Sequence, residues 1–182
     1  ALQLVQAVET QRGIILIGHH RAHSPIMAKA REVIASGQLG KLVAVMGSAT
    51  FYKPDSYFAD GPWRREPGGG PLLLNMIHEV HNLRILCGEI VAVQAFASHA
   101  TREFAVEDTV AISLQFASGA LGTFMLSDTA ASARSWEQTS QENKSYTSYD
   151  DEDCYVSAGT LGSLSVPTMR LKTYAQARSE EH

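Results

Sequence analysis

The stretch that decides the fold is GGGPLLLNMIHEVHNLRILCG, residues 68–88, in which three glycines and a proline lead directly into an apolar segment. Proline suits the first turn of a helix, where the N–H that it lacks would have no partner. Glycines before that turn let a ligand approach the backbone closely, and the free N–H groups at a helix start favour an electron-rich ligand group. The stretch therefore predicts a helix that begins near Pro71 and faces a ligand.

This helix carries a stripe of polar side chains. Steps of four and three residues return to the same side of a helix, so Asn75, His78 and Asn82 share a face, and Glu79 lies beside it. Two interpretations stay open from the residues alone. Either the stripe faces solvent and His78 makes a structural hydrogen bond, or His78 titrates near neutral pH and exchanges a proton with a substrate hydroxyl that Asn75 orients.

The histidines also allow a third interpretation, a metal site. His20 and His23 have the spacing HxxH, and His19 precedes them. His78 and His81 repeat this spacing in the helix, and four imidazoles would hold zinc if the loop met the helix. Because no carboxylate or cysteine stands at a fixed offset, this signal is weak. We expect no metal, and a His-rich metal-site protein is the least favoured alternative.

The composition limits the class of protein. The 182 residues are 45% hydrophobic and 19% charged, with a formal net charge of −4, as is typical of a globular protein with one domain. Nothing in that charge attracts a phosphate backbone, and no apolar run approaches the roughly 20 residues of a membrane span. We expect neither a nucleic-acid nor a membrane partner. Cys87 and Cys154 form no CxxC or secretory framework, which favours reduced thiols and a cytoplasmic location.

The remaining chain predicts an α+β fold. A helix is expected over 25–36, a long strand over 42–52 and mostly loop over 53–70. After the quoted stretch, strands are expected within 89–100, 108–117, 120–130, 154–160, 163–167 and 169–174, with a tight turn at 118–119 and an exposed strand plus loop over 134–153. Together they predict one large, predominantly antiparallel sheet that has helices on one face and is open on the other.

The first residues predict a helix and a strand that belong to a different domain. Residues 1–18, ALQLVQAVETQRGIILIG, read as a helix that stops at Gly13 and a buried strand. We expect residues 1–20 to be the last helix and strand of a preceding α/β domain, and residues 21–182 to form a second domain, with more chain following the polar tail at 179–182. The chain contains no GxGxxG or GxxxxGK[ST], and thus no nucleotide-phosphate loop of its own.

The order of these motifs resembles the Gfo/Idh/MocA family, named for glucose-fructose oxidoreductase and inositol dehydrogenase. The matching segments are GHHRAHSP (18–25), SGQLGKLV (36–43), YKPDSYF (52–58), WRREPGGGPLLLNMIHEVHNLRILCG (63–88), VEDTVAISLQFASGALGTFMLSDTA (106–130) and GTLGSLSVP (159–167). The resemblance covers nearly all of the chain, and the glycine-rich helix with its histidine is its most specific part. It implies an N-terminal Rossmann domain that binds NAD or NADP, followed by a substrate-binding and dimerisation domain with a large open sheet.

The activity implied by this resemblance is hydride transfer between a nicotinamide and a carbon of a sugar, inositol or related polyol. The family's histidine, eight places after the last glycine, falls on His78, which is implied to be the general acid/base. The family's lysine lies in a Glu-Lys-Pro motif that this chain lacks. Lys53 and Pro54 follow Tyr52 and are not that motif, so the isolated chain is expected to be inactive.

Further site residues are implied in the same way. The loop GHHRAH resembles the family's loop near the nicotinamide, which implies His20 and Arg21 at the cofactor end of the cleft, unless the arginine is simply solvated. Trp63 and Arg64 precede the helix, where the Trp ring would cover a sugar face or merely pin the loop.

The helix contributes the remaining substrate-binding candidates, Asn75 and His81. Inositol dehydrogenase-like members place an aspartate four residues before the histidine, where this chain has Leu74, and His81 stands where many members have an acidic residue. Asn75 is expected to supply a hydrogen bond instead, although an amide cannot take a proton as a carboxylate does. The alternative to an enzyme is therefore a non-catalytic binding or dimerisation module with the family fold. In either case the open sheet face implies a homo-oligomer.

Overall fold

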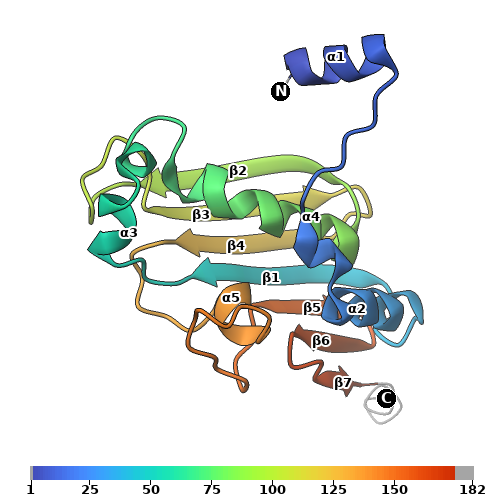
Figure 1. Ribbon diagram of the computed structural model, residues 1–182. Helices are drawn as coiled ribbons and strands as arrows, with labels where there is room; N and C mark the ends of the chain where they lie inside the picture. Colours follow the sequence, from blue (N-terminus) through green and yellow to red (C-terminus); the bar gives the residue numbers. More distant parts are fainter. Residues whose placement is uncertain (1, 175–182) are drawn as a thin grey trace.

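A computed structural model describes residues 2–174 (Figure 1). Seven strands form one sheet in the order β2-β3-β4-β1-β5-β6-β7. Their bounds are β1 Leu42–Thr50, β2 Ile90–Ser98, β3 Thr109–Phe116, β4 Leu121–Ser127, β5 Tyr155–Gly159, β6 Gly162–Val166 and β7 Leu171–Thr173. β1 and β4 run parallel, whereas every other neighbouring pair is antiparallel. The predicted α+β class with a predominantly antiparallel sheet is confirmed.

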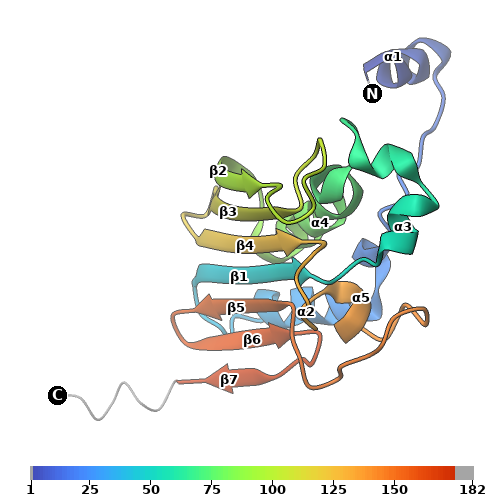
Figure 2. The same ribbon diagram turned by 90° about the vertical axis from the view of Figure 1, so that its left-hand side faces the viewer.

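Apart from the first helix, which stands clear of the sheet, the helices gather on one face, and the opposite face is open (Figure 2). The α-helices are α1 Leu2–Gln11, α2 Pro25–Ala35, α3 Asp55–Ala59, α4 Ile77–Cys87 and α5 Trp136–Thr139. Three further helical elements are the 3-10 helices η1 (His20–His23) and η2 (Pro62–Arg65) and a π-helical turn, η3 (Leu72–Met76), which continues into α4. Within residues 2–174, no helix combines the length and apolarity that a bilayer crossing requires.

The core lies between the helices and the inner face of the sheet. In β3 the buried side chains alternate with exposed ones, because successive residues of a strand point to opposite faces. Val110, Ile112, Leu114 and Phe116 thus point inward and join one continuous apolar cluster. This alternation is the reason that one sheet face packs against helices while the other remains uncovered.

Two segments differ from their predictions. The strand expected over 14–18 does not form, and Ile14 and Leu16 are 88% and 90% exposed. A strand needs a neighbour for its backbone N–H and C=O groups, and within the described residues none runs beside this segment. The exposed strand expected within 134–153 is instead helix α5 with loops, because Trp136 is buried against the core. The expectation about the tail at 179–182 lies outside the described residues.

The glycine-rich start of the long helix serves close packing. A Cβ on Gly69 would lie 2.7 Å from backbone atoms of Arg64, and Gly70 has φ +80°. The N–H of Leu72 donates to the Glu107 carboxylate at 2.9 Å. The electron-rich group expected at the helix start is thus a side chain of the chain itself, which satisfies one of the free N–H groups there. The glycines let the loop that carries Arg64 lie directly on the helix.

Gly69→Ala is therefore expected to lower the free energy of unfolding by about 1–3 kcal/mol, because the added methyl group has no space beside the Arg64 backbone. Urea denaturation of both chains measures the difference. Gly18→Ala is the matched control, since no atom lies within 4 Å of a Cβ at Gly18. Equal stability of the two variants would contradict the packing role of Gly69.

Candidate active site on the glycine-rich helix

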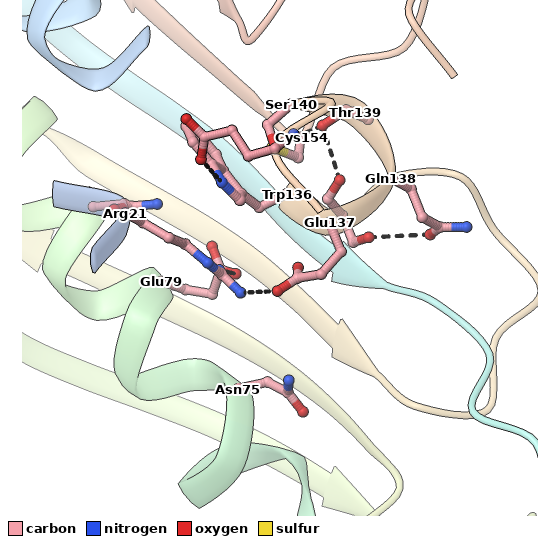
Figure 3. A network of polar contacts seen from close by, with 12 residues as sticks. Arg21, Asn75, Glu79, Trp136, Glu137, Gln138, Thr139, Ser140 and Cys154 are labelled. Carbon is pink, nitrogen blue, oxygen red and sulfur yellow. Dashed lines mark hydrogen bonds and ion pairs between the residues drawn. The ribbon is translucent and has the colours of Figure 1, made fainter. Parts of the chain in front are cut away.

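A buried ion network fixes the helix in place. Arg21 lies in η1 and is 2% exposed, and its guanidinium donates to the carboxylates of Glu79 on α4 and Glu137 on α5 (Figure 3). The hydroxyl of Tyr155 on β5 donates to the second oxygen of Glu79. The amide of Asn82 in turn donates to the Tyr155 hydroxyl at 3.1 Å. One network therefore joins the loop before α2 to α4, to α5 and to the sheet.

The titration of this network is governed by burial. Burial raises the pKa of Glu79, although Arg21 and the hydrogen bond from Tyr155 act in the opposite direction. Burial and the neighbouring Glu79 carboxylate raise the pKa of Tyr155 well above its usual value, so this phenol stays protonated and donates. Burial lowers the pKa of Arg21, but the carboxylates of Glu79 and Glu137 outweigh it and raise that pKa overall. Arg21 is consequently a permanent cation at the centre of the network.

The polar stripe predicted on the helix is divided between two environments. Glu79 and Asn82 are 1% and 0% exposed and point into the core, whereas Asn75 and His78 are part-buried. The solvent-facing interpretation of the stripe is therefore wrong for Glu79 and Asn82. The π-helical turn η3 contains Asn75 and immediately precedes α4, and such turns are rare and occur frequently at functional sites.

The loop held by Arg21 lies against the helix histidines. The ring centroid of His20 is 5.5 Å from that of His78, and the ring of His19 is 5.2 Å from His81 and 5.6 Å from His78. The Nδ1 atoms of His19 and His81 are 3.2 Å apart. The rings of these pairs meet edge-on or tilted. Within residues 2–174, no three His, Cys, Asp or Glu side chains are placed to hold one metal ion. The structure joins the loop and helix histidines without forming a metal cage.

His78 has the environment of a proton acceptor. Its Nδ1 atom is buried and has no hydrogen-bond partner among the described residues. Burial lowers the pKa of His78. Electrostatic repulsion from Arg21, and then from His20 and His19, lowers it further. The imidazole is therefore neutral at pH 7 and free to take a proton. The pKa of His81 is lowered in the same direction, by burial and then by His19.

Lys53, which the sequence reasoning left out of the site, lies within it. Its side chain is buried, with the residue 4% exposed, and Nζ donates to Asn75 Oδ1 at 2.8 Å and to the Tyr57 hydroxyl at 3.3 Å. Burial lowers the pKa of Lys53 to about 8. No spacing rule identifies this lysine, because only the folded chain brings the end of β1 to the helix. Its position between two aromatic residues, Phe51 and Tyr57, was the available signal.

The loop before the helix adds two of the predicted residues. The Arg64 guanidinium lies 3.9 Å from the centre of the Tyr57 ring and donates to the Tyr57 carbonyl. Trp63 is 53% exposed and lies beside Arg64, with 5.5 Å between its ring and the guanidinium carbon. Leu74, at the position of the family's acid, is part-buried. Asn75, Lys53, Tyr57 and Arg64 thus form a connected group one helical turn from His78.

Removal of Arg21 is expected to be costly. Arg21→Met leaves the buried Glu79 and the part-buried Glu137 without their cation, so the free energy of unfolding should fall by about 3–5 kcal/mol. Arg84→Met removes an exposed ion pair with Glu89 and should leave the free energy of unfolding nearly unchanged, because water screens such pairs. Urea denaturation at pH 7 compares the two. A similar small loss in both variants would contradict the structural role of Arg21.

Comparisons with known proteins identify the fold independently. The family model described as the GFO/IDH/MocA C-terminal domain matches residues 27–165. Among curated proteins, no sequence matches the chain significantly.

Solved structures with this fold include three oxidoreductases. The WlbA dehydrogenase from Chromobacterium violaceum, in complex with NADH and UDP-GlcNAcA, has a TM-score of 0.72 and 20% identity over 90% of this chain and 43% of its own. An oxidoreductase from Agrobacterium radiobacter, in complex with NAD+, L-tartaric acid and magnesium, has a TM-score of 0.71 and 17% identity over 94% and 46%. Aldose-aldose oxidoreductase from Caulobacter crescentus, complexed with glycerol, has a TM-score of 0.67 and 23% identity over 87% and 42%.

This chain spans less than half the length of each of these three structures, and at such identities the likeness concerns the fold. The family model, however, matches most of the sequence, including the glycine-rich helix and the strands that follow it. The chain therefore belongs to the Gfo/Idh/MocA oxidoreductase family, and the match is to its C-terminal domain.

Proposed function

We propose that this chain is the substrate-binding part of an NAD(P)-dependent oxidoreductase that transfers hydride between a nicotinamide and a carbon of a sugar, inositol or related polyol. The observation that carries the proposal is the state of His78. It is neutral at pH 7, part-buried, and has an Nδ1 atom without a partner among the described residues. Because buried polar atoms are nearly always hydrogen-bonded, a group beyond this chain's described residues is expected to complete its environment.

In the proposed reaction, His78 takes the hydroxyl proton of the polyol while the hydride leaves the same carbon, which becomes a carbonyl. The nicotinamide supplies the hydride acceptor when bound. In the reverse direction His78 returns the proton to the new hydroxyl, as a general acid. Asn75 orients the substrate from the preceding turn, and the exposed Trp63 ring covers a sugar face beside Arg64. His81, which contacts His19, lies at the border of the same site.

The cofactor belongs to the N-terminal side of this arrangement. We assign residues 1–20 to the end of a Rossmann domain, in whose sheet the exposed apolar segment 14–18 would be a strand. His20 contacts His78 and then lies at the cofactor end of the cleft. Arg21 is buried and engaged by two carboxylates, so it positions this loop rather than touching the cofactor. The solved structures that contain NADH or NAD+ support a nicotinamide cofactor, and the isolated chain is expected to be inactive.

The open sheet face is the proposed interface between two copies of the protein. Large apolar side chains are exposed on it, among them Met46 at 56%, Phe96 at 78%, Leu121 at 60% and Met125 at 43%. Strand pairing places Met46 beside Thr123 and Phe96 beside Ala111, on the side away from the helices. Burial of such a surface contributes about 25 cal/mol per Å² of apolar area, which favours a homodimer.

His78→Ala in the complete protein, Rossmann domain included, should lower kcat/KM for polyol oxidation by about a hundredfold or more. The assay is NAD and NADP reduction with a panel of sugars and inositols. His99→Ala is the matched control, because His99 lies in the loop after β2 and contacts the Phe104 carbonyl.

In the wild type, the acidic limb of the pH profile of kcat/KM should lie below pH 6.5, since burial lowers the pKa of His78, the base that must be neutral.

Two results would contradict this assignment. If the His78 variant is as fast as wild type, then the helix is scaffold. If the complete protein is folded and dimeric but reduces neither cofactor with any polyol, the alternative of a non-catalytic binding or dimerisation module is favoured. Leu74 at the position of the family's acid is the observation behind that alternative.

Met125→Glu should convert the dimer to a monomer, because a carboxylate on the open face would be buried without a partner in the interface. Sedimentation velocity at micromolar concentration measures the change. Ala28→Glu adds the same charge on the exposed side of α2 and should leave the assembly unchanged. A Met125→Glu protein that sediments as the wild type would place the interface elsewhere.

A further inference from the structure

We propose that the group around Asn75 selects a polyol that carries an anionic oxygen group, a carboxylate or a phosphate, and that Lys53 and Arg64 bind this group. The inference deepens the proposed function and rests on it for the reaction, but its geometry comes from residues outside the His78 assignment. Three observations carry it: a buried ammonium without a carboxylate, an amide fixed as a donor, and a second cation on the same aromatic ring.

The first observation concerns Lys53. Its Nζ contacts only the neutral oxygens of Asn75 and Tyr57, and within residues 2–174 it forms no ion pair with a carboxylate. The nearby Asp128 is engaged instead by Arg102, whose Nε lies 2.9 Å from Oδ1. Arg102 also donates to the carbonyl of Lys53 itself. A buried charge is normally paired, so the ammonium lacks the anion that such a site requires.

The second observation concerns the donors left over. An ammonium has three N–H donors, and the contacts of Lys53 to Asn75 and Tyr57 use two of them. Because Asn75 Oδ1 accepts from Lys53, the amide orientation is fixed and its NH2 group is left to face a ligand. This NH2 group makes no hydrogen bond among the described residues. Asn75 and Lys53 therefore offer free donors, and the acceptor between them, Asn75 Oδ1, is already engaged by the ammonium.

The third observation is Arg64. Its guanidinium and the Lys53 ammonium both lie over the Tyr57 ring, at 3.9 and 4.4 Å from the centroid. Arg64 makes no ion pair within the part of the chain that the structure describes. A sugar hydroxyl both donates and accepts, whereas a carboxylate or phosphate only accepts, and charge-assisted hydrogen bonds to such groups are the stronger ones. A site that combines two cations with a free amide donor therefore favours an anionic group.

This anionic group would lie next to the reacting carbon. Asn75 and His78 are three residues apart, and residues at that spacing are neighbours on a helix surface. His78 would face the hydroxyl that loses its proton while Lys53, Asn75 and Arg64 hold the acid. The site thus selects acidic sugars or sugar phosphates over neutral polyols.

The affinity for the anion should depend on pH. Burial lowers the pKa of Lys53 to about 8; Asp128 and Glu137 act to raise it, and Arg64 and Arg102 to lower it. The charged form, which binds the anion, therefore prevails below pH 8. Affinity is expected to fall as the pH rises through 8, and to fall less for a variant with arginine at this position.

The test is direct binding to the complete protein, Rossmann domain included, measured by isothermal titration calorimetry at pH 7 without turnover. The carboxylate probes are D-glucuronate, D-galacturonate and D-gluconate. The phosphate probes are D-glucose 6-phosphate and D-galactose 6-phosphate. Their neutral counterparts are D-glucose, D-galactose and sorbitol. At least one acidic probe should bind tenfold or more tightly than its neutral counterpart. Lys53→Met should abolish that preference, Lys53→Arg should retain most of it, and Lys41→Met, at an exposed lysine, should leave it unchanged.

The arms of this test separate the outcomes. Preference for uronates or gluconate identifies a carboxylate, and preference for the sugar phosphates identifies a phosphate. Neutral probes that bind as tightly as their acidic counterparts, or the absence of binding by every acidic probe, would overturn the inference. Acid binding without any NAD(P) reduction would defeat the proposed reaction and leave this inference standing, whereas turnover of neutral polyols alone would do the reverse.

Thermal unfolding gives a second measurement. A folded-state pKa near 8 lies below the usual lysine value of 10.5, so the charged ammonium destabilises the fold at pH 7 and ceases to do so as the pH approaches 10.5. Lys53→Met should therefore unfold a few degrees above the wild type at pH 7, by roughly 2–4 °C, with a smaller difference at pH 10. A lower midpoint in the variant would mean that the chain itself compensates the charge, and would contradict the need for an anionic ligand.

Discussion

The buried guanidinium of Arg21 is the constraint on which the rest of the site depends. It joins Glu79 of α4 and Glu137 of α5, and Glu79 in turn accepts from Tyr155 in the sheet. Three segments far apart in the sequence are thereby fixed around one charge. Such a network does not have to add stability over an apolar core, but breaking it leaves uncompensated carboxylates. The network instead sets the position of the loop that carries Arg21, and this loop brings His19 and His20 onto the helix beside His78.

Arg21 and Lys53, two buried cations, contrast with each other. Arg21 has two carboxylate partners and a raised pKa, whereas Lys53 has none and a pKa lowered to about 8. The first is complete within the chain and serves the fold. The charged Lys53 destabilises the fold, because no carboxylate of the described residues pairs with it. Destabilising groups of this kind are found at sites that a ligand completes. The helix that carries Asn75, His78 and Glu79 joins both environments, so its placement links the fold to the proposed chemistry.

Periodicity predicted the sheet, its helical face and the glycine-rich helix, because alternation and helical spacing are local properties of the sequence. The family resemblance supplied His78, whose catalytic role stays a proposal. Neither source predicted the π-helical turn around Asn75, the use of Glu107 at the helix start or the contact of Lys53 with Asn75. The last two depend on contacts between segments 22 and 35 residues apart, which no local pattern encodes. The segment 14–18 was expected as a strand from its apolar residues, but a strand also needs a partner, which the described residues do not provide.

The central claim is that substrate and nicotinamide meet on the face of the helix formed by η3 and α4 that carries Asn75 and His78. A crystal structure of the complete protein with the oxidised cofactor and an acidic sugar tests it most directly. The account predicts a substrate hydroxyl within hydrogen-bond reach of His78, about 3 Å, the nicotinamide on the side of His20, and the acid group on Lys53. A substrate bound elsewhere, for example on the open sheet face, would contradict the account.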